Sequence, residues 1–277
     1  MFTTTNEVAS NRVLAFAVNP EGTLGEVASY ATGGVGSGDS LGSQGALVLS
    51  EDRRFLIAVN AGSDDVSVFE VHGAELDLRQ RVSSGGKRPI SVTERGRLVY
   101  VVNAGSNDVA GFSLDPNGEL APIAGSTRPL SGGAAGPAQI ALSPDASALI
   151  VTEKTRNVIT LFGVETSGQL SEPTATVSEG TTPFGFEFKQ RGELVVSEAA
   201  TGSLSSYAVA ATGVAAISSA VPDTQQAACW VAFSPDDRFA FTTNAASASI
   251  SSYTVSSTGE LALHNAVAAN LGAGGTP

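Results

Sequence analysis

The apolar residues of this chain gather in short runs that each end in a polar residue and recur at a regular distance. The runs are Leu56-Ile57-Ala58-Val59-Asn60, Val99-Tyr100-Val101-Val102-Asn103, Leu149-Ile150-Val151-Thr152-Glu153, Leu194-Val195-Val196-Ser197-Glu198 and Ala240-Phe241-Thr242-Thr243-Asn244. Their polar ends are 43, 50, 45 and 46 residues apart, and Met1 to Asn6 has the same pattern. A period of about 20 to 50 residues indicates one structural unit used several times.

Each run is followed by a loop and by a segment in which apolar and polar residues alternate, as in Asp65-Val66-Ser67-Val68-Phe69. Alternation with a period of two residues is typical of β-strands. A glycine turn such as Pro116-Asn117-Gly118 then leads to a further strand, and a turn such as Ser143-Pro144-Asp145 precedes the next polar-ended run. Each repeat therefore predicts four strands joined by hairpins.

Repeated four-stranded units predict an all-β fold, a β-propeller of four-stranded blades, with six blades visible in the chain. A two-sheet sandwich is the alternative, but a sandwich has no physical need for a repeat of this length. Hydrophobic residues make up 42% of the chain and charged residues 15%, which favours order throughout. We expect residues 1–277 to form a single propeller domain.

Charge and cysteine usage restrict the partners and the compartment. Lys and Arg number 15 and Asp and Glu 27, a net charge of −12 that opposes binding to nucleic acid or to an anionic membrane. No run of 18 apolar residues occurs, and the first residues lack the pattern of a signal peptide. We expect a soluble, cytoplasmic protein, although a removed signal peptide would leave no trace. Cys229 is the only cysteine, so no internal disulfide can form.

If the four strands are called A to D, the B-to-C loops and the D-to-A connections of a propeller emerge on the same face. This face should collect polar residues that are scattered along the sequence. We expect the B-strand ends to contribute Asn6, Asn60, Asn103, Glu153, Glu198 and Asn244, with Lys154 and Arg156 in the loop beside Glu153. We expect the D-to-A connections to contribute Gln44, Lys87, Arg88, Arg128, Gln139, Gln225, Gln226 and Cys229.

Such a polar funnel suits a small anionic or sugar-acid substrate. Glu153 and Glu198 are the candidate catalytic residues, because a carboxylate can activate water as a general base. The candidate substrate-binding residues are Arg88, Arg128, Lys154, Asn60, Asn103, Asn244 and Gln139. A structural role is the alternative, since Asn at a strand end commonly satisfies loop backbone groups.

The remaining candidate residues are less suited to catalysis. His72 falls in a C-to-D turn and His264 in a D strand, both away from the funnel. Cys229, next to Trp230, has no visible activating base and is read as a small apolar residue. No phosphate-binding loop, zinc-ligand spacing or Gly-x-Ser-x-Gly elbow is present, so we expect neither cofactor nor metal. The oligomeric state is left open.

The segments Ser29-Tyr30-Ala31-Thr32-Gly33-Gly34, Leu41-Gly42-Ser43-Gln44-Gly45-Ala46 and Ala58-Val59-Asn60-Ala61-Gly62-Ser63, with the repeated Ser-Pro-Asp turns, resemble the propeller lactonases of the 6-phosphogluconolactonase and carboxymuconate cyclase-like type. The resemblance implies hydrolysis of a sugar-acid lactone in the central channel. Family members often carry Pro-His at the start of strand A, whereas this chain has Pro137-Ala138-Gln139. The segment Tyr100 to Ser106 also resembles Tyr-Val-Thr-Asn repeat propellers, so a non-catalytic binding propeller is the alternative.

The resemblance also implies a seven-bladed ring. Five copies of the repeat are complete, and the first begins at its B strand. The sequence ends at Gly274-Gly275-Thr276-Pro277, where a further A strand should begin. We therefore expect one blade and a closing strand to be absent from this chain, and the ring to be open between the Met1 blade and the Cys229–Ala269 blade.

Overall fold

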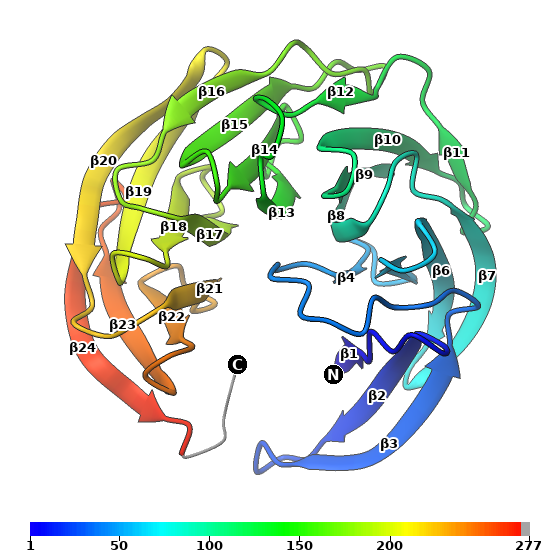
Figure 1. Cartoon of the computed structure of the whole chain (residues 1–277). Coiled ribbons are helices and arrows are strands. Elements are labelled where there is room, and N and C mark those ends of the chain that lie inside the picture. The colour runs from blue at the N-terminus through cyan, green and yellow to red at the C-terminus, as the bar shows by residue number, and fades with distance from the viewer. Residues whose placement is uncertain (273–277) are drawn as a thin grey trace. The chain divides into compact units, whose positions relative to one another are not determined.

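The computed structural model describes residues 1–272, without the side chains of residues 26 and 27. All regular structure in this part of the chain is β-strand, arranged in six antiparallel sheets (Figure 1). The all-β prediction is therefore confirmed. The same residues contain no helix that is long and apolar enough to cross a membrane.

The sheets follow one another along the chain, and strands within each are paired in sequence order. Sheet 1 contains β1 (Phe2–Thr4), β2 (Arg12–Val18) and β3 (Leu24–Ala31); sheet 2 contains β4 (Leu47–Leu49), β5 (Phe55–Asn60), β6 (Asp65–His72) and β7 (Glu75–Ser83). Sheet 3 contains β8 (Pro89–Arg95), β9 (Leu98–Asn103), β10 (Asp108–Leu114) and β11 (Leu120–Pro122), with β12 (Arg128–Pro129) also paired to β10.

The remaining sheets each have four strands, which we call A to D in chain order as in sheet 2. Sheet 4 contains β13 (Pro137–Leu142), β14 (Ala148–Glu153), β15 (Val158–Gly163) and β16 (Thr174–Val177). Sheet 5 contains β17 (Pro183–Phe188), β18 (Leu194–Glu198), β19 (Ser203–Ala210) and β20 (Gly213–Pro222). Sheet 6 contains β21 (Ala228–Phe233), β22 (Phe239–Asn244), β23 (Ser249–Val255) and β24 (Leu261–Asn270).

The chain divides into two compact units. The first contains residues 1–130 and 164–171 and therefore sheets 1 to 3; the second contains residues 131–163 and those from 172 on, and therefore sheets 4 to 6. The expectation of a single domain over residues 1–277 and that of a gap in the ring both remain predictions. The sequence end at residues 274–277, on which the second depends, lies outside the described residues.

Alternating apolar side chains form a core wherever two sheets of a unit face each other. In the first unit, one core joins sheets 1 and 2 and another joins sheets 2 and 3; their members include Val13, Leu56, Ala58 and Phe69, and Ile57, Val68, Val101 and Phe112. In the second unit, the cores include Ile150, Ile159, Phe186 and Tyr207, and Val195, Leu204, Ala240 and Tyr253. Each of these side chains is nearly inaccessible to solvent, so burial of apolar area holds neighbouring sheets together.

A hydroxyl near the end of strand B also ties one sheet of the second unit to the next. Thr152 Oγ1 donates to the carbonyl of Phe184 in β17 at 2.5 Å, and Ser197 Oγ donates to the carbonyl of Cys229 in β21. Thr243 occupies the same position in β22. These two hydrogen bonds fix strand A of the following sheet in its position along strand B.

The outer face of sheet 6 differs from the corresponding faces of sheets 4 and 5. Counted back from the end of strand B, Phe241 corresponds to Ile150 and Val195. The two aliphatic side chains are 0% exposed, whereas Phe241 is 36% exposed and Trp230, on the same face, is 41% exposed. The same repeat position is therefore covered by the next sheet in two cases and open in the third.

Candidate functional site

Five residues that end strand B share one geometry, and we call them the B-end residues: Asn60, Asn103, Glu153, Glu198 and Asn244. Each is 0% exposed. Their side chains point across to strand C of the same sheet. Asn60, Glu198 and Asn244 bond there to the residues five and seven positions further along the chain, Asn103 bonds to the first of these positions and Glu153 to the second. Asn103, Glu153 and Glu198 also bond to the D-to-A connection that enters the sheet. In these three sheets the B-end residue thus fastens the connection to the sheet.

Glu198 has the largest set of partners. Its Oε1 accepts hydrogen bonds from Ser178 Oγ at 3.0 Å, from the Gly180 amide at 2.7 Å and from Ser205 Oγ at 2.7 Å. Its Oε2 accepts from Ser203 Oγ at 2.8 Å. Hydrogen bonds to an ionised group are the strong ones, so these donors stabilise the buried carboxylate.

Glu153 has a similar environment. It accepts hydrogen bonds from Thr160 Oγ1 at 2.6 Å, from the Ser131 amide at 3.1 Å and from the Ser131 hydroxyl. Ser131 belongs to the connection that enters β13. Both predicted catalytic carboxylates are therefore buried and bonded to serine, threonine and amide donors, an arrangement suited to positioning the connection.

The asparagines bond to strand C as donors, whereas the two glutamates accept from it. Asn60 Nδ2 donates to Asp65 Oδ1 at 2.6 Å and to Ser67 Oγ at 2.8 Å, and Asn60 Oδ1 accepts from Asn11. Asn244 Nδ2 donates to Ser249 Oγ and Ser251 Oγ at 3.2 and 2.8 Å. Asn103 Nδ2 donates to Asp108 Oδ1 at 2.9 Å. The substrate-binding role predicted for these three residues is untested, and their burial favours the structural alternative.

Asn6 does not share this position. β1 ends at Thr4, and Asn6 adopts a left-handed backbone conformation with φ of 54°. Its side chain donates to Ser37 Oγ and to the carbonyl of Asp39. The predicted place of Asn6 among the B-strand ends is wrong, because the strand stops before it and the loop turns there.

Gln139 and Arg128 lie within strands and not in the D-to-A connections where we expected them. Gln139 is buried in β13 and pairs with the backbone of Phe186, donating at 2.9 Å and accepting at 2.7 Å. Arg128 is in β12, and its Nη1 donates to the carbonyls of Gly125 and Thr127. Because both side chains bind backbone, their predicted contacts with substrate remain without support.

Two cations of the first unit lie in the connection between β7 and β8. Lys87 Nζ pairs with Asp64 Oδ2 at 2.9 Å, and the Arg88 amide donates to Asp64 Oδ1 at 2.7 Å. Although burial opposes ionisation, these two donors hold the pKa of Asp64 below its ordinary value. Arg88 is exposed and has φ of 52°, so the Asp64 carboxylate stabilises an unusual backbone conformation and leaves the guanidinium at the surface.

Lys154 of the second unit follows Glu153 directly. Its Nζ lies 4.9 Å from the centre of the Phe184 ring, a cation–π contact. Cys229 is half-buried, and burial raises the pKa of its thiol while the Ala245 amide and the Lys154 charge act in the opposite direction. Lys154, Phe184 and Cys229 come from the B-to-C loop of sheet 4 and the A strands of sheets 5 and 6. The structure therefore brings a cation, an aromatic face and a thiol to the inner strands of this unit.

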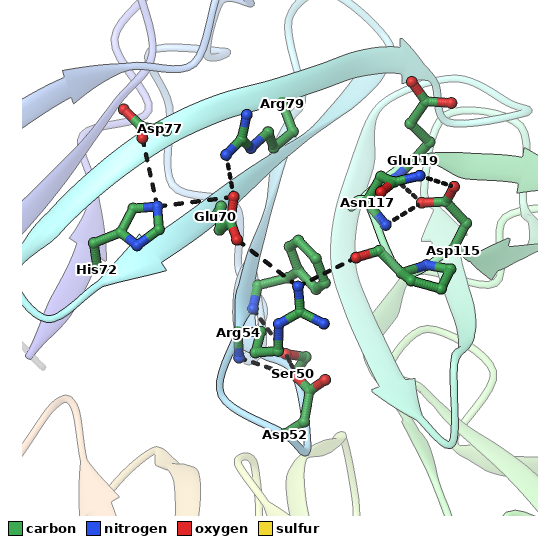
Figure 2. Close-up of polar contacts among 12 residues, drawn as sticks. Ser50, Asp52, Arg54, Glu70, His72, Asp77, Arg79, Asp115, Asn117 and Glu119 are labelled. Atoms are coloured by element: carbon green, nitrogen blue, oxygen red, sulfur yellow. Dashed lines mark hydrogen bonds and ion pairs between the residues drawn. The ribbon is translucent and has the colours of Figure 1, made fainter.

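The histidines lie where the sequence predicts, away from these groups. His72 ends β6 and faces Glu70 and Asp77 at 3.8 and 3.5 Å, as Figure 2 shows. His264 lies in β24 against the ring of Phe239. Among residues 1–272, no group of three or more His, Cys, Asp and Glu side chains is placed to hold a metal ion.

One recurring position was missed by the sequence interpretation. Asp64, Asn107 and Asn157 each lie four residues after a B-end residue and have φ between 55° and 59°. Asn157 Oδ1 accepts from the Thr182 amide at 2.7 Å, as Asp64 does from Arg88. The spacing of Asx residues after the polar end of each run is the signal that predicts these caps.

Comparison with known proteins agrees with the succession of antiparallel sheets, because the matching family is one of β-propellers. A family model described as a seven-bladed β-propeller lactonase matches residues 3–128 and 124–200. No curated protein matches the sequence.

Solved structures are similar in fold. A protein from Lactobacillus plantarum is 17% identical with a TM-score of 0.75, over 95% of this chain and 80% of that chain. A proposed 6-phosphogluconolactonase from Bacteroides uniformis is 22% identical with a TM-score of 0.70, over 91% of this chain and 77% of that chain. The periplasmic gluconolactonase of Pseudomonas aeruginosa is 18% identical with a TM-score of 0.73, over 94% and 78%. At these identities the likeness concerns the fold alone, whereas the family model covers more than half of the sequence: the chain belongs to the family of seven-bladed β-propeller lactonases.

Proposed function

We propose that this protein hydrolyses the lactone of a sugar acid. The observation that carries the proposal is the match of the lactonase family model over residues 3–200. Two of the similar solved structures are a gluconolactonase and a proposed 6-phosphogluconolactonase. The reaction adds water across the ring ester, so the product is an open hydroxy acid with a free carboxylate.

Lys154 is the substrate-binding residue that we propose in the second unit. Its ammonium lies over the Phe184 ring, and a sugar ring can lie against the same aromatic face while its oxygens accept from the ammonium. The Arg88 guanidinium provides a corresponding exposed cation in the first unit. An anionic product or substrate is favoured near either group.

Glu153 and Glu198 enter this proposal mainly as positioning residues. Glu153 precedes Lys154 in the chain, and its bonds to Ser131 and Thr160 fix the strand end from which Lys154 projects. A general base needs reach to the attacking water, and a carboxylate that is 0% exposed lacks it in this conformation. The catalytic role of the two residues stays a prediction.

The test is a lactone assay on the full chain with glucono-1,5-lactone and 6-phosphogluconolactone, followed by acid release in a pH-stat. We expect Lys154→Gln to raise KM at least about tenfold, while Lys154→Arg retains most of the activity because the charge is kept. Arg95→Gln is the matched control, since Arg95 is a half-buried cation at the end of β8, where it pairs with Glu51. Absence of turnover above the uncatalysed rate with every lactone would contradict the proposal.

A non-catalytic binding propeller is the second candidate. The burial of both candidate carboxylates favours it, because a binding protein needs no general base. Calorimetric binding of gluconate or a related sugar acid without turnover of its lactone would support this function over the first.

A further inference from the structure

A buried lysine occupies the A-to-B turn of sheet 5. Lys189 is only 4% exposed, although lysine is rarely buried without a partner. The corresponding turns of sheets 2, 4 and 6 have Ser50, Ser143 and Ser234 at this position, and each serine accepts a backbone amide within its own turn. Lys189 instead reaches the C-to-D turn of sheet 6, where its Nζ donates to the carbonyl of Ser256 at 2.8 Å.

A cation makes the equivalent contact between sheets 2 and 3, but there it has a carboxylate beside it. Figure 2 shows Arg54 between the turn of sheet 3 and Glu70. Arg54 Nη2 donates to the carbonyl of Pro116 at 3.2 Å and lies 3.8 Å from Glu70 Oε1. Counted from the B-end residues, the place of Glu70 is taken by Ala208 in sheet 5. The carboxylate that faces the cation in sheet 2 thus has no counterpart at this position of sheet 5.

Two arginines join Lys189 around one pocket. A pocket of about 520 Å³ is lined by Lys189 and Arg191 of the sheet 5 turn, by Asp236, Asp237 and Arg238 of the sheet 6 turn, and by Ser256. Arg191 and Arg238 are exposed. Within residues 1–272, no carboxylate lies within 4.0 Å of a nitrogen of these three cations.

The two aspartates of the pocket accept hydrogen bonds from residues of the two turns. Asp236 Oδ1 accepts from Ser234 Oγ at 2.6 Å and from the Arg238 amide at 3.2 Å, and the Ser234 hydroxyl lowers the pKa of Asp236. Asp237 Oδ2 accepts from the Gln190 amide at 2.8 Å. An ammonium offers three donors and a guanidinium five, whereas the hydrogen bonds that these two carboxylates accept in the turns come from a hydroxyl and from backbone amides.

We propose that this pocket binds a small oxyanion carrying two or more negative charges. Lys189 would supply a point charge at the floor, and Arg191 and Arg238 would close on the oxygens with their planar donor pairs. The ligand would replace the missing counter-charge of a buried ammonium, which is costly to leave unbalanced. The site lies at the A-to-B turns, whereas Lys154 and Arg88 lie at the opposite ends of their B and A strands, so this inference does not rest on the proposed function.

The test is isothermal titration of the full chain with inorganic phosphate at low ionic strength, with sodium chloride at equal ionic strength as the reference. We expect the double variant Arg191→Gln, Arg238→Gln to weaken phosphate binding at least about tenfold, because two charge-assisted donor sets are lost. Arg53→Gln is the matched control, since Arg53 is an exposed arginine of the corresponding turn in sheet 2 and should leave binding within about twofold of the wild type.

A second readout keeps the test independent of the variants' folding. Saturating phosphate should raise the melting temperature of the wild type more than chloride does, and this difference should vanish in the double variant. Equal binding by wild type and double variant, or no binding to the wild type at millimolar phosphate, would overturn the inference. Lactone turnover should be the same in the wild type and the double variant, so failure here is distinct from failure of the proposed activity.

Discussion

Replacement of Glu198 separates a structural role of the B-end residues from a catalytic one. In Glu198→Gln, the amide oxygen can keep the acceptor position of Oε1, which receives Ser178, Gly180 and Ser205. The amide nitrogen takes the place of Oε2 and donates to Ser203, whose hydroxyl can turn its proton to Thr201 Oγ1 at 2.7 Å. In Glu198→Ala no acceptor is left for these donors.

The two variants should differ strongly in stability. In Glu198→Gln, three charge-assisted bonds become neutral at about 1 kcal/mol each, and the lower cost of burying an uncharged amide offsets part of this, which leaves a loss of about 1–2 kcal/mol. In Glu198→Ala, unsatisfied donors and a cavity should cost about 4 kcal/mol. At about 2–4 °C per kcal/mol, the expected shifts in melting temperature are about 2–8 °C and 8–16 °C.

The assay pairs urea or thermal unfolding with lactone turnover on the same samples. A positioning residue predicts that activity measured below the unfolding transition falls in Glu198→Gln by less than about tenfold. A general base predicts a fall of about 10² to 10⁴ with little change in stability. The reasoning is refuted if Glu198→Ala unfolds within about 0.5 kcal/mol of the wild type, since the buried bonds would then contribute nothing.

Three further outcomes follow from buried groups of the second unit. Gly180→Ala should destabilise by more than about 2 kcal/mol in urea titrations, because a Cβ would lie 2.5 Å from Glu198 Cδ, whereas Gly133→Ala, with open space around it, should be nearly neutral. Asp223 is 0% exposed and burial raises the pKa of its carboxyl, so the folded state holds the proton more tightly than the unfolded one. Below the pKa of Asp223 in the unfolded chain, the carboxyl is protonated in both states and has no effect on stability. As the pH rises from there through the pKa in the folded state, the buried charge increasingly destabilises the fold. Asp223→Asn should therefore raise the melting temperature at pH 7 but not near pH 3. Because burial raises the pKa of Cys229, its thiol should react with a disulfide reagent at pH 8 more slowly than a thiol in urea-unfolded chain.

The repeat made the fold and the B-end residues predictable. A polar residue at the end of an apolar run, such as Glu198, can be located from spacing alone because every blade must return its chain at the same height. Burial of that residue could not be predicted in the same way. It depends on the connection that passes over it, and the Gly180 amide and Ser178 reach Glu198 from a different part of the sequence.

Two of the errors of position, those of Asn6 and Gln139, have a common cause. Asn6 and Gln139 were placed by counting along a strand, but strand limits are set by backbone pairing that the residue pattern leaves undefined by one or two positions. β1 ends early at Thr4, and β13 starts early at Pro137 with a shift of register between Pro137 and Gln139. A shift of one residue exchanges the two faces of a strand, which turned Gln139 from an expected surface donor into a buried clamp on Phe186.

The exposed aromatic face of sheet 6 has the same apolar character as the faces of sheets 4 and 5 that the following sheets cover. Ile150, Val195 and Phe241 occupy the same position of the repeat, and each presents an apolar side chain on which another sheet can pack. A sheet that packs on Phe241 and Trp230 would bury apolar area there, as sheet 5 does on Ile150 and sheet 6 does on Val195.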